Sequence, residues 1–273
     1  MDARIRWLLP AVIAGCVWIG ANLLLIYGLG WGTDAAVLPE GVADSVQRQY
    51  ESRAWPEAGA GGGAGQGLHY RVLLPSGTEG PQPLLVFLHG SGQRGSNNTS
   101  QLKGLPSQLV AREWRSRCPG MIIAPQCPAQ SSWTMEIPRL LSLIESWRRD
   151  TRVDPRRVYV TGLSMGGFGT WQLLAERPEW FAAAVPICGG GDAGTAATLV
   201  RMPIWAVHGD ADAVVPVEQS REMIRAVQDA GGEPRYTELP GVGHDSWTET
   251  YRDADGVLAW LYEQRNDRCE ECR

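Results

Sequence analysis

The stretch that decides the fold is Val158-Tyr-Val-Thr-Gly-Leu-Ser-Met-Gly-Gly-Phe-Gly169, near the middle of a 273-residue chain. Its apolar start, Val158 to Thr161, is typical of a buried strand, and a helix-compatible segment, Phe168 to Glu176, follows the G-x-S-x-G sequence. In a nucleophile elbow a serine occupies a strained strand-to-helix turn, and flanking glycines remove Cβ atoms that would collide with neighbouring chain. We therefore expect Ser164 to be a nucleophile at such a turn. The alternative is a glycine-rich turn with an incidental serine.

Segments typical of strands and helices alternate along most of the chain. The strand candidates are Leu84–Leu88, Met121–Ala124, Phe181–Ile187, Ile204–Val207 and Tyr236–Leu239. The helix candidates are Ile137–Arg149, Val217–Ala230 and Val257–Leu261. This alternation predicts an α/β fold, a mostly parallel central sheet flanked by helices, with active groups at the carboxyl ends of the strands.

The segment before this pattern holds two more strand candidates, Tyr50–Trp55 and Leu68–Leu74. They flank a glycine-rich run, residues 59–67, which lacks the side chains to hold a regular element. The run is therefore either a linker or the enlarged loop of a hairpin.

A serine hydroxyl needs a base, and the order in this fold is serine, acid, histidine. His69 and His89 precede Ser164, and no carboxylate at a strand end lies between Ser164 and His208. We therefore expect His244, in the loop after Tyr236–Leu239, to be the base.

The acid should come from the loop that follows Ile204–Val207, which offers Asp210 and Asp212. Asp245, next to the expected base, is a weaker candidate.

The developing negative charge on a substrate carbonyl needs backbone N–H donors, and Met165, directly after the expected nucleophile, supplies one. A second donor should come from the glycine-containing loop His89–Gly95, whose alternative reading is a flexible turn.

Several motifs resemble those of a bacterial group of α/β-hydrolase serine esterases, the phospholipase/carboxylesterase group that includes polyhydroxybutyrate depolymerase-like and feruloyl-esterase-like members. The motifs are Phe87–Gly90, Ala124–Pro128, Gly162–Gly167, Pro186–Gly190, His208–Pro216 and Gly243–Trp247. The resemblance implies that Asp212 is the acid, with Asp210 supporting the loop, and that Ser91 is the second oxyanion donor. It also implies a single catalytic domain without metal or cofactor, in which residues 59–67 form a hairpin loop.

These inferences predict an enzyme, a serine esterase that cleaves carboxylic ester bonds through an acyl-enzyme, with a small-molecule or polysaccharide-linked ester as substrate. Trp133 and Trp247 are candidate walls of the substrate pocket. The alternatives are a prolyl-oligopeptidase-like serine peptidase and a non-enzymatic, hydrolase-like binding domain. The natural ester and the oligomeric state are not encoded in any recognisable pattern.

The amino terminus differs from the rest in being apolar or small at every position from Trp7 to Trp31 except Asn22. About 20 such residues can cross a bilayer, and Arg4 and Arg6 before them favour a cytoplasmic tail. We expect a transmembrane helix in residues 1–31, then a spacer (32–49), a catalytic domain (50–265) on the extracytoplasmic side and a cysteine-containing tail (266–273). The alternatives are a cleaved signal peptide and a lipoprotein with a lipidated Cys16.

Export makes disulfides plausible for Cys118 and Cys127 and for the terminal pair Cys269 and Cys272, and free thiols are the alternative. The net charge is −5, with no block of Lys or Arg, so nucleic acid is not expected as a partner.

Overall fold

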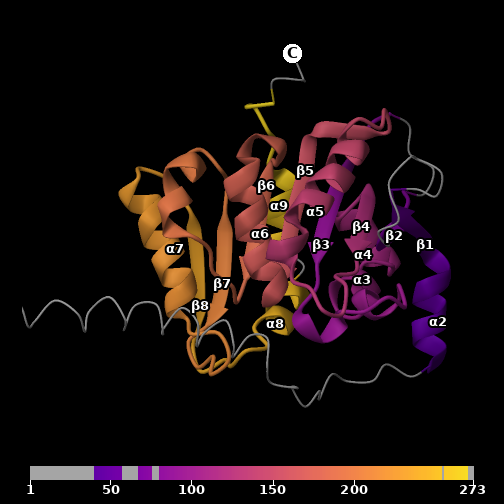
Figure 1. Cartoon of the computed structure of the whole chain (residues 1–273), viewed down its shortest axis with the longest axis horizontal. Coiled ribbons are helices and arrows are strands. Elements are labelled where there is room, and N and C mark those ends of the chain that lie inside the picture. Colours follow the sequence, from indigo (N-terminus) through magenta and orange to yellow (C-terminus); the bar gives the residue numbers. More distant parts are fainter. Residues whose placement is uncertain (1–39, 57–66, 76–79, 254, 270–273) are drawn as a thin grey trace, which may run out of the picture. The chain divides into compact units, whose positions relative to one another are not determined.

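The computed structural model describes residues 40–56, 67–75, 80–253 and 255–269, all of which belong to one compact unit, Leu38–Arg273. They form an eight-stranded sheet in the order β1-β2-β4-β3-β5-β6-β7-β8 (Figure 1). β2 pairs antiparallel with β1 and β4, and the other neighbours pair in parallel. The strands are β1 (Glu51–Trp55), β2 (Leu68–Leu73), β3 (Gln82–Leu88), β4 (Met121–Pro125), β5 (Val153–Leu163), β6 (Ala183–Ile187), β7 (Trp205–Gly209) and β8 (Arg235–Leu239).

Helices cover both faces of the sheet, which confirms the predicted α/β-hydrolase architecture over the described residues (Figure 1). The α-helices are α2 (Glu40–Gln49), α3 (Leu105–Gln108), α4 (Arg112–Arg117), α5 (Trp133–Arg148), α6 (Met165–Glu176), α7 (Glu218–Asp229), α8 (Trp247–Arg252) and α9 (Val257–Glu263). α5, α6 and α7 contribute to one apolar cluster, and α2, α3, α4, α8 and α9 to the other.

The alternation of side chains along β3 explains how one strand serves both clusters. Leu84, Val86 and Leu88 belong to the cluster under α5 and α6, whereas Leu85 and Phe87 belong to the opposite one. All five are fully buried, so a continuous apolar run here marks a strand covered on both faces.

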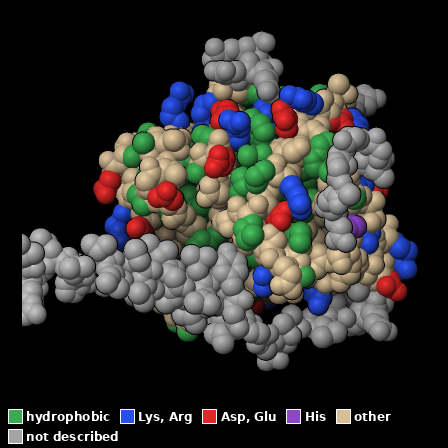
Figure 2. Space-filling model, in the orientation of Figure 1, with side chains coloured by type: hydrophobic (Ala, Val, Ile, Leu, Met, Phe, Trp, Pro, Cys, Tyr) green, Lys and Arg blue, Asp and Glu red, His purple; other side chains and the backbone are tan. Residues whose placement is uncertain are grey.

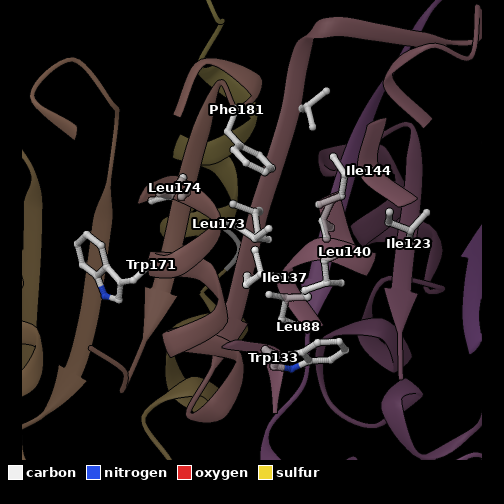
Figure 3. Packing of buried hydrophobic residues seen from close by; sticks show 14 of the residues in the cluster. Leu88, Ile123, Trp133, Ile137, Leu140, Ile144, Trp171, Leu173, Leu174 and Phe181 are labelled. Carbon is white, nitrogen blue, oxygen red and sulfur yellow. The ribbon is translucent and has the colours of Figure 1, made fainter. Parts of the chain in front are cut away.

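Figure 3 shows the first cluster, where side chains of α5 and α6 pack against the strands. Ile137, Leu140 and Ile144 follow one face of α5 and meet Leu173 of α6 over the sheet. The predicted helix face in this segment is therefore the buried one.

The strands on either side of the glycine-rich run pair with each other, as the hairpin interpretation predicts. β1 and β2 pair directly, from Glu51 opposite Val72 to Trp55 opposite Leu68. Residues 57–66, which hold most of the glycine-rich run, lie outside the described residues.

The amino-terminal boundary differs from the expected one. Residues 40–49, predicted as the end of a spacer, form α2, and Val46 of that helix is buried in the second cluster. Tyr50, directly after α2, is also buried and donates a hydrogen bond to the carbonyl of Pro106. The catalytic unit therefore begins at least one helix before residue 50.

The cysteines follow different patterns. Cys118 and Cys127 are free and buried, so the disulfide considered for them is wrong. They lie beyond opposite ends of β4, whose five residues span about 16 Å. Cys269 is disulfide-bonded, whereas Cys272 lies outside the described residues. The first residues of the predicted tail pack on the domain, since Asn266 binds the carbonyls of Arg156 and Glu179.

Between residues 40 and 269, leaving aside the segments not described, no helix has the length and apolarity that a bilayer crossing demands. The predicted transmembrane segment, Trp7 to Trp31, lies outside the described residues. On the face drawn in Figure 2, basic and acidic side chains are interspersed, in agreement with the low net charge.

Candidate active site

Ser164 occupies a strained turn between β5 and α6. Its backbone has φ 54° and ψ −118°, in the positive-φ region that non-glycine residues rarely adopt. A Cβ on Gly162 would lie 2.4 Å from the carbonyl oxygen of Gly166, and one on Gly166 would lie 2.0 Å from that of Leu88. The flanking glycines therefore allow backbone contacts that hold the serine in this conformation, as the motif predicts.

The structure brings the predicted nucleophile, base and acid together, although they are far apart in the sequence. His244 Nε2 lies 2.9 Å from Ser164 Oγ, and His244 Nδ1 lies 2.7 Å from Asp212 Oδ2. The Asp212 side chain is fully buried, and that of His244 is 20% exposed. The imidazole thus lies between a buried carboxylate and a hydroxyl that substrate can approach.

Asp212 is held by donors on both carboxylate oxygens. Oδ1 accepts hydrogen bonds from the amides of Val214 and Val215 at 2.8 and 2.9 Å, and Oδ2 faces His244 and, at 3.2 Å, His208 Nε2. Burial by itself would raise the pKa of Asp212, but the hydrogen bonds from His208, His244 and the Val215 amide outweigh it and hold that pKa well below its usual range. The carboxylate is therefore ionised at neutral pH.

The other two candidate acids lie elsewhere. Asp210 Oδ1 accepts a hydrogen bond from the Gly241 amide at 2.6 Å, which ties the loop after β7 to the one after β8. Asp245 accepts from the amide and hydroxyl of Thr248, in the first turn of α8. Asp210 thus has the supporting contact that the resemblance implies.

The loop after β3 lies against the nucleophile. A Cβ on Gly90 would lie 3.8 Å from Ser164 Cβ, and Ser91 begins the short 3-10 helix that follows. Met165 begins α6, where the first amides of a helix have no partner within the helix. In the described part of the chain, the amides of Ser91 and Met165 have no hydrogen-bond acceptor, as expected of the two predicted oxyanion donors.

His89 fixes the base of this loop. Its buried Nε2 accepts a hydrogen bond from the Cys127 amide at 3.0 Å, which leaves the ring hydrogen on Nδ1, 2.6 Å from the carbonyl oxygen of Gly90. Burial lowers the pKa of His89 to about 4, so the ring is neutral at working pH. Trp133 Nε1 donates to the His89 carbonyl at 2.8 Å.

Trp133 is a core residue, so its expected place in a pocket wall is wrong. It is fully buried and lies near Leu88 in Figure 3. It also packs against Gly169, since a Cβ added to that glycine would lie 2.6 Å from the Cβ of Trp133. Trp247, the other candidate, packs edge-on against the ring of His244 at 5.3 Å between centroids.

Sequence reasoning missed two residues beside the three central side chains. His208 contacts Asp212, as described, and the Cys188 sulfur lies 3.3 Å from the Ser164 amide. Cys188 itself has φ 39°. Both lie in motifs of the resemblance, His208 at the start of His208–Pro216 and Cys188 within Pro186–Gly190, but neither motif indicates a contact with the three central side chains.

Over the described ranges, Cys188, Asp212 and His244 are the sole group of three potential ligands close enough to hold a metal ion. Burial raises the pKa of the Cys188 thiol, and the carboxylate and imidazole are engaged with each other. This set does not fit a resident metal.

Comparison with known proteins agrees with the fold and the motifs. The Dienelactone hydrolase family matches residues 129–264. A solved thermostable esterase is 34% identical and superposes with a TM-score of 0.72, covering 81% of this chain and 64% of the esterase chain. The chain therefore has the α/β-hydrolase fold, and its residues 129–264 are similar to the Dienelactone hydrolase family.

Two curated relatives are modular or longer proteins. A bifunctional acetylxylan esterase/xylanase from Neocallimastix patriciarum is 27% identical over 61% of this chain and 24% of its own length. Poly(3-hydroxyalkanoate) depolymerase C from Paucimonas lemoignei is 33% identical over 43% of this chain and 30% of its own length. The chain thus spans less than a third of either relative. Solved peptidases also match, at under 20% identity, which shows the fold alone.

Proposed function

We propose that this protein is a carboxylic ester hydrolase that uses Ser164, His244 and Asp212 as a catalytic triad. The observation that carries the proposal is the 2.9 Å separation of His244 Nε2 from Ser164 Oγ, with Nδ1 of the same ring 2.7 Å from Asp212. In this arrangement, Nδ1–H donates to the carboxylate, so Nε2 is free to accept the serine proton.

In the first half of the reaction, Ser164 Oγ attacks the ester carbonyl carbon as its proton passes to His244 Nε2. The carbonyl oxygen becomes an oxyanion, which accepts hydrogen bonds from the Ser91 and Met165 amides. One such donor is typically worth about 3 to 4 kcal/mol. The C–O bond to the alcohol then breaks, His244 returns the proton to the departing alcohol, and an acyl-serine remains.

In the second half, water takes the place of the alcohol. His244 Nε2 accepts a proton from the water as its oxygen attacks the acyl carbon, and the same two amides hold the second oxyanion. Collapse of this intermediate breaks the bond to Ser164 Oγ, which recovers its proton from His244. Asp212 stays ionised and stabilises the imidazolium in both halves.

The comparisons support an ester as substrate. The matched family, the solved esterase and the two curated relatives carry names of hydrolases, and one relative is an acetylxylan esterase. We propose that the substrate is a carboxylic ester of a small molecule or of a group linked to a polysaccharide, and that no cofactor takes part.

Active-site labelling tests the nucleophile. We expect a fluorophosphonate probe to label the wild type and Ser96→Ala, a control at an exposed serine, but not Ser164→Ala. Both Ser164→Ala and His244→Ala should lower kcat about 10⁴- to 10⁶-fold, and the double variant little more, because the residues act as a unit. Additive losses would contradict the triad, and persistent labelling of Ser164→Ala would exclude Ser164.

Substrate comparison tests the bond that is cleaved. We expect p-nitrophenyl acetate to be hydrolysed with a much higher kcat/KM than a proline-peptide anilide. Acetyl, feruloyl and longer acyl esters then define the acyl group. Preference for the anilide would replace the esterase by the peptidase alternative, and no labelling or turnover at all would favour the binding-domain alternative.

We also propose that residues 1–31 export the domain and anchor it to the membrane, on the strength of the apolar run Trp7–Trp31 and the arginines before it. Fractionation of cells that express the full chain tests the proposal. An anchored protein stays with the membrane after an alkaline wash, whereas release of a shortened chain would indicate a cleaved signal peptide, and lipid labelling would indicate processing at Cys16.

A further inference from the structure

The feature behind this inference is a second histidine on the same carboxylate oxygen that His244 uses. His208, at the carboxyl end of β7, is fully buried. Its Nε2 lies 3.2 Å from Asp212 Oδ2 and 3.0 Å from the carbonyl oxygen of Val215. Because both neighbours only accept hydrogen bonds, Nε2 carries a hydrogen and donates it towards them.

The other side of the ring supports the same orientation. His208 Nδ1 lies 2.8 Å from the hydroxyl of Ser220, which lies 2.9 Å from the carbonyl oxygen of Gly189. Ser220 has one hydrogen. Whichever acceptor takes it, Nε2–H faces Asp212 Oδ2 and the carbonyl oxygen of Val215 together, so the contact with Asp212 does not depend on the orientation of Ser220.

We propose that His208 is a positioning residue for ester hydrolysis, which acts on the base His244 through the shared oxygen of Asp212. This inference rests on the proposed function. With two amides on Oδ1 and two imidazoles on Oδ2, the carboxylate cannot rotate without losing several hydrogen bonds. The His208 donor also takes up part of the negative charge that would otherwise act on His244.

Because the His208 donor takes up part of the charge on Asp212, its removal should change the pH dependence of kcat/KM. Without the His208 donor, Asp212 is a stronger acceptor and favours the protonated form of His244 more. Removing His208 should therefore shift the acid limb of kcat/KM to higher pH.

The other charged and titratable groups around His208 remain in such a variant. Glu238 on β8 lies opposite His208 in the strand register and is paired with Arg221 of α7. Cys188, directly after β6, also lies close to Asp212. Since these groups are unchanged, a shift would report on the contact between His208 and Asp212.

The experiment compares His208→Leu, which has no donor, with His208→Gln, whose amide can still donate. For His208→Leu, we expect kcat to fall about 10- to 100-fold with a small change in KM, and the acid limb to move up by about 0.5 to 1 pH unit. His208→Gln should recover most of the wild-type profile. An acid limb at the wild-type pH in both variants would overturn the inference.

Two further measurements address a His208 variant that does not fold and a failure of the proposed function itself. If His208→Leu does not fold, His208→Met takes its place as the variant without a donor. An acid limb and a downfield proton resonance of the His244–Asp212 hydrogen bond that both stay at the wild-type position would then count against the inference. Fluorophosphonate labelling of the wild type and Ser164→Ala separates the two failures. If labelling depends on Ser164 but the His208 variants keep the wild-type profile, only the role of His208 is wrong.

Discussion

Lowering the pH should reduce the free energy of unfolding of this domain because His89, which has no part in the proposed reaction, is buried. The ring is fully buried, accepts a hydrogen bond from the Cys127 amide on Nε2, and has a pKa that burial lowers to about 4. In the unfolded chain the pKa of histidine is about 6.5. Between these values the unfolded state holds the extra proton, so stability falls as the pH falls from 6.5 to 4, and His89 adds no further loss below that. At about 1.4 kcal/mol per pH unit, the contribution is about 3 kcal/mol.

Urea unfolding followed by tryptophan fluorescence at pH 4, 5, 6 and 7 measures this contribution. His89→Gln removes the titrating group and keeps an amide of similar polarity, and His69→Gln on β2 is the matched control. We expect the free energy of unfolding to fall by about 3 kcal/mol less in His89→Gln than in the wild type over this range, with His69→Gln following the wild type. Parallel decreases in the wild type and His89→Gln would refute the reasoning.

Three other outcomes follow from the site and the core. Asp212→Asn should lower kcat by about 100-fold or more, since it disturbs the His244 tautomer, whereas Asp210→Asn should lower kcat less than about tenfold. The opposite ranking would assign the acid to Asp210. Gly166→Ala, whose Cβ would lie 2.0 Å from the Leu88 carbonyl, should lower the free energy of unfolding by about 3 kcal/mol or more, and Gly92→Ala, with open space around it, should change it little. A thiol reagent should modify the three buried free cysteines only after unfolding, and rapid modification of any of them in the folded protein, located by peptide mapping, would contradict their burial. They are Cys118, Cys127 and Cys188.

Much of the fold follows from the sequence because the central strands are buried on both faces. Runs such as Leu84–Leu88 are apolar at consecutive positions, a signal that few other elements produce. Helix α2 was missed because its burial depends on contacts that only the fold creates, with Val46 in the second cluster and Tyr50 bonded to Pro106.

At the site, chain order and motif type predicted which residues come together, but not their surroundings. The sequence alone could not separate Asp210 from Asp212, because they differ by two positions in one loop and only the backbone decides which faces His244. Trp133 was misassigned for a similar reason: an indole near a strand end can face a cleft or the core, and here Gly169 leaves room for it inside. The contact of His208 with Asp212 depends on the turn between them.

The nucleophile and the base are separated by 80 positions along the chain. During translation, Ser164 and its elbow emerge well before β7, β8 and the loop that holds His244, and domains generally fold as units. On the proposed mechanism, a nascent or truncated polypeptide that ends before this loop carries a serine with no group to activate it. Hydrolytic capacity would then arise late in biosynthesis, which would protect the cell's own esters from a half-made enzyme.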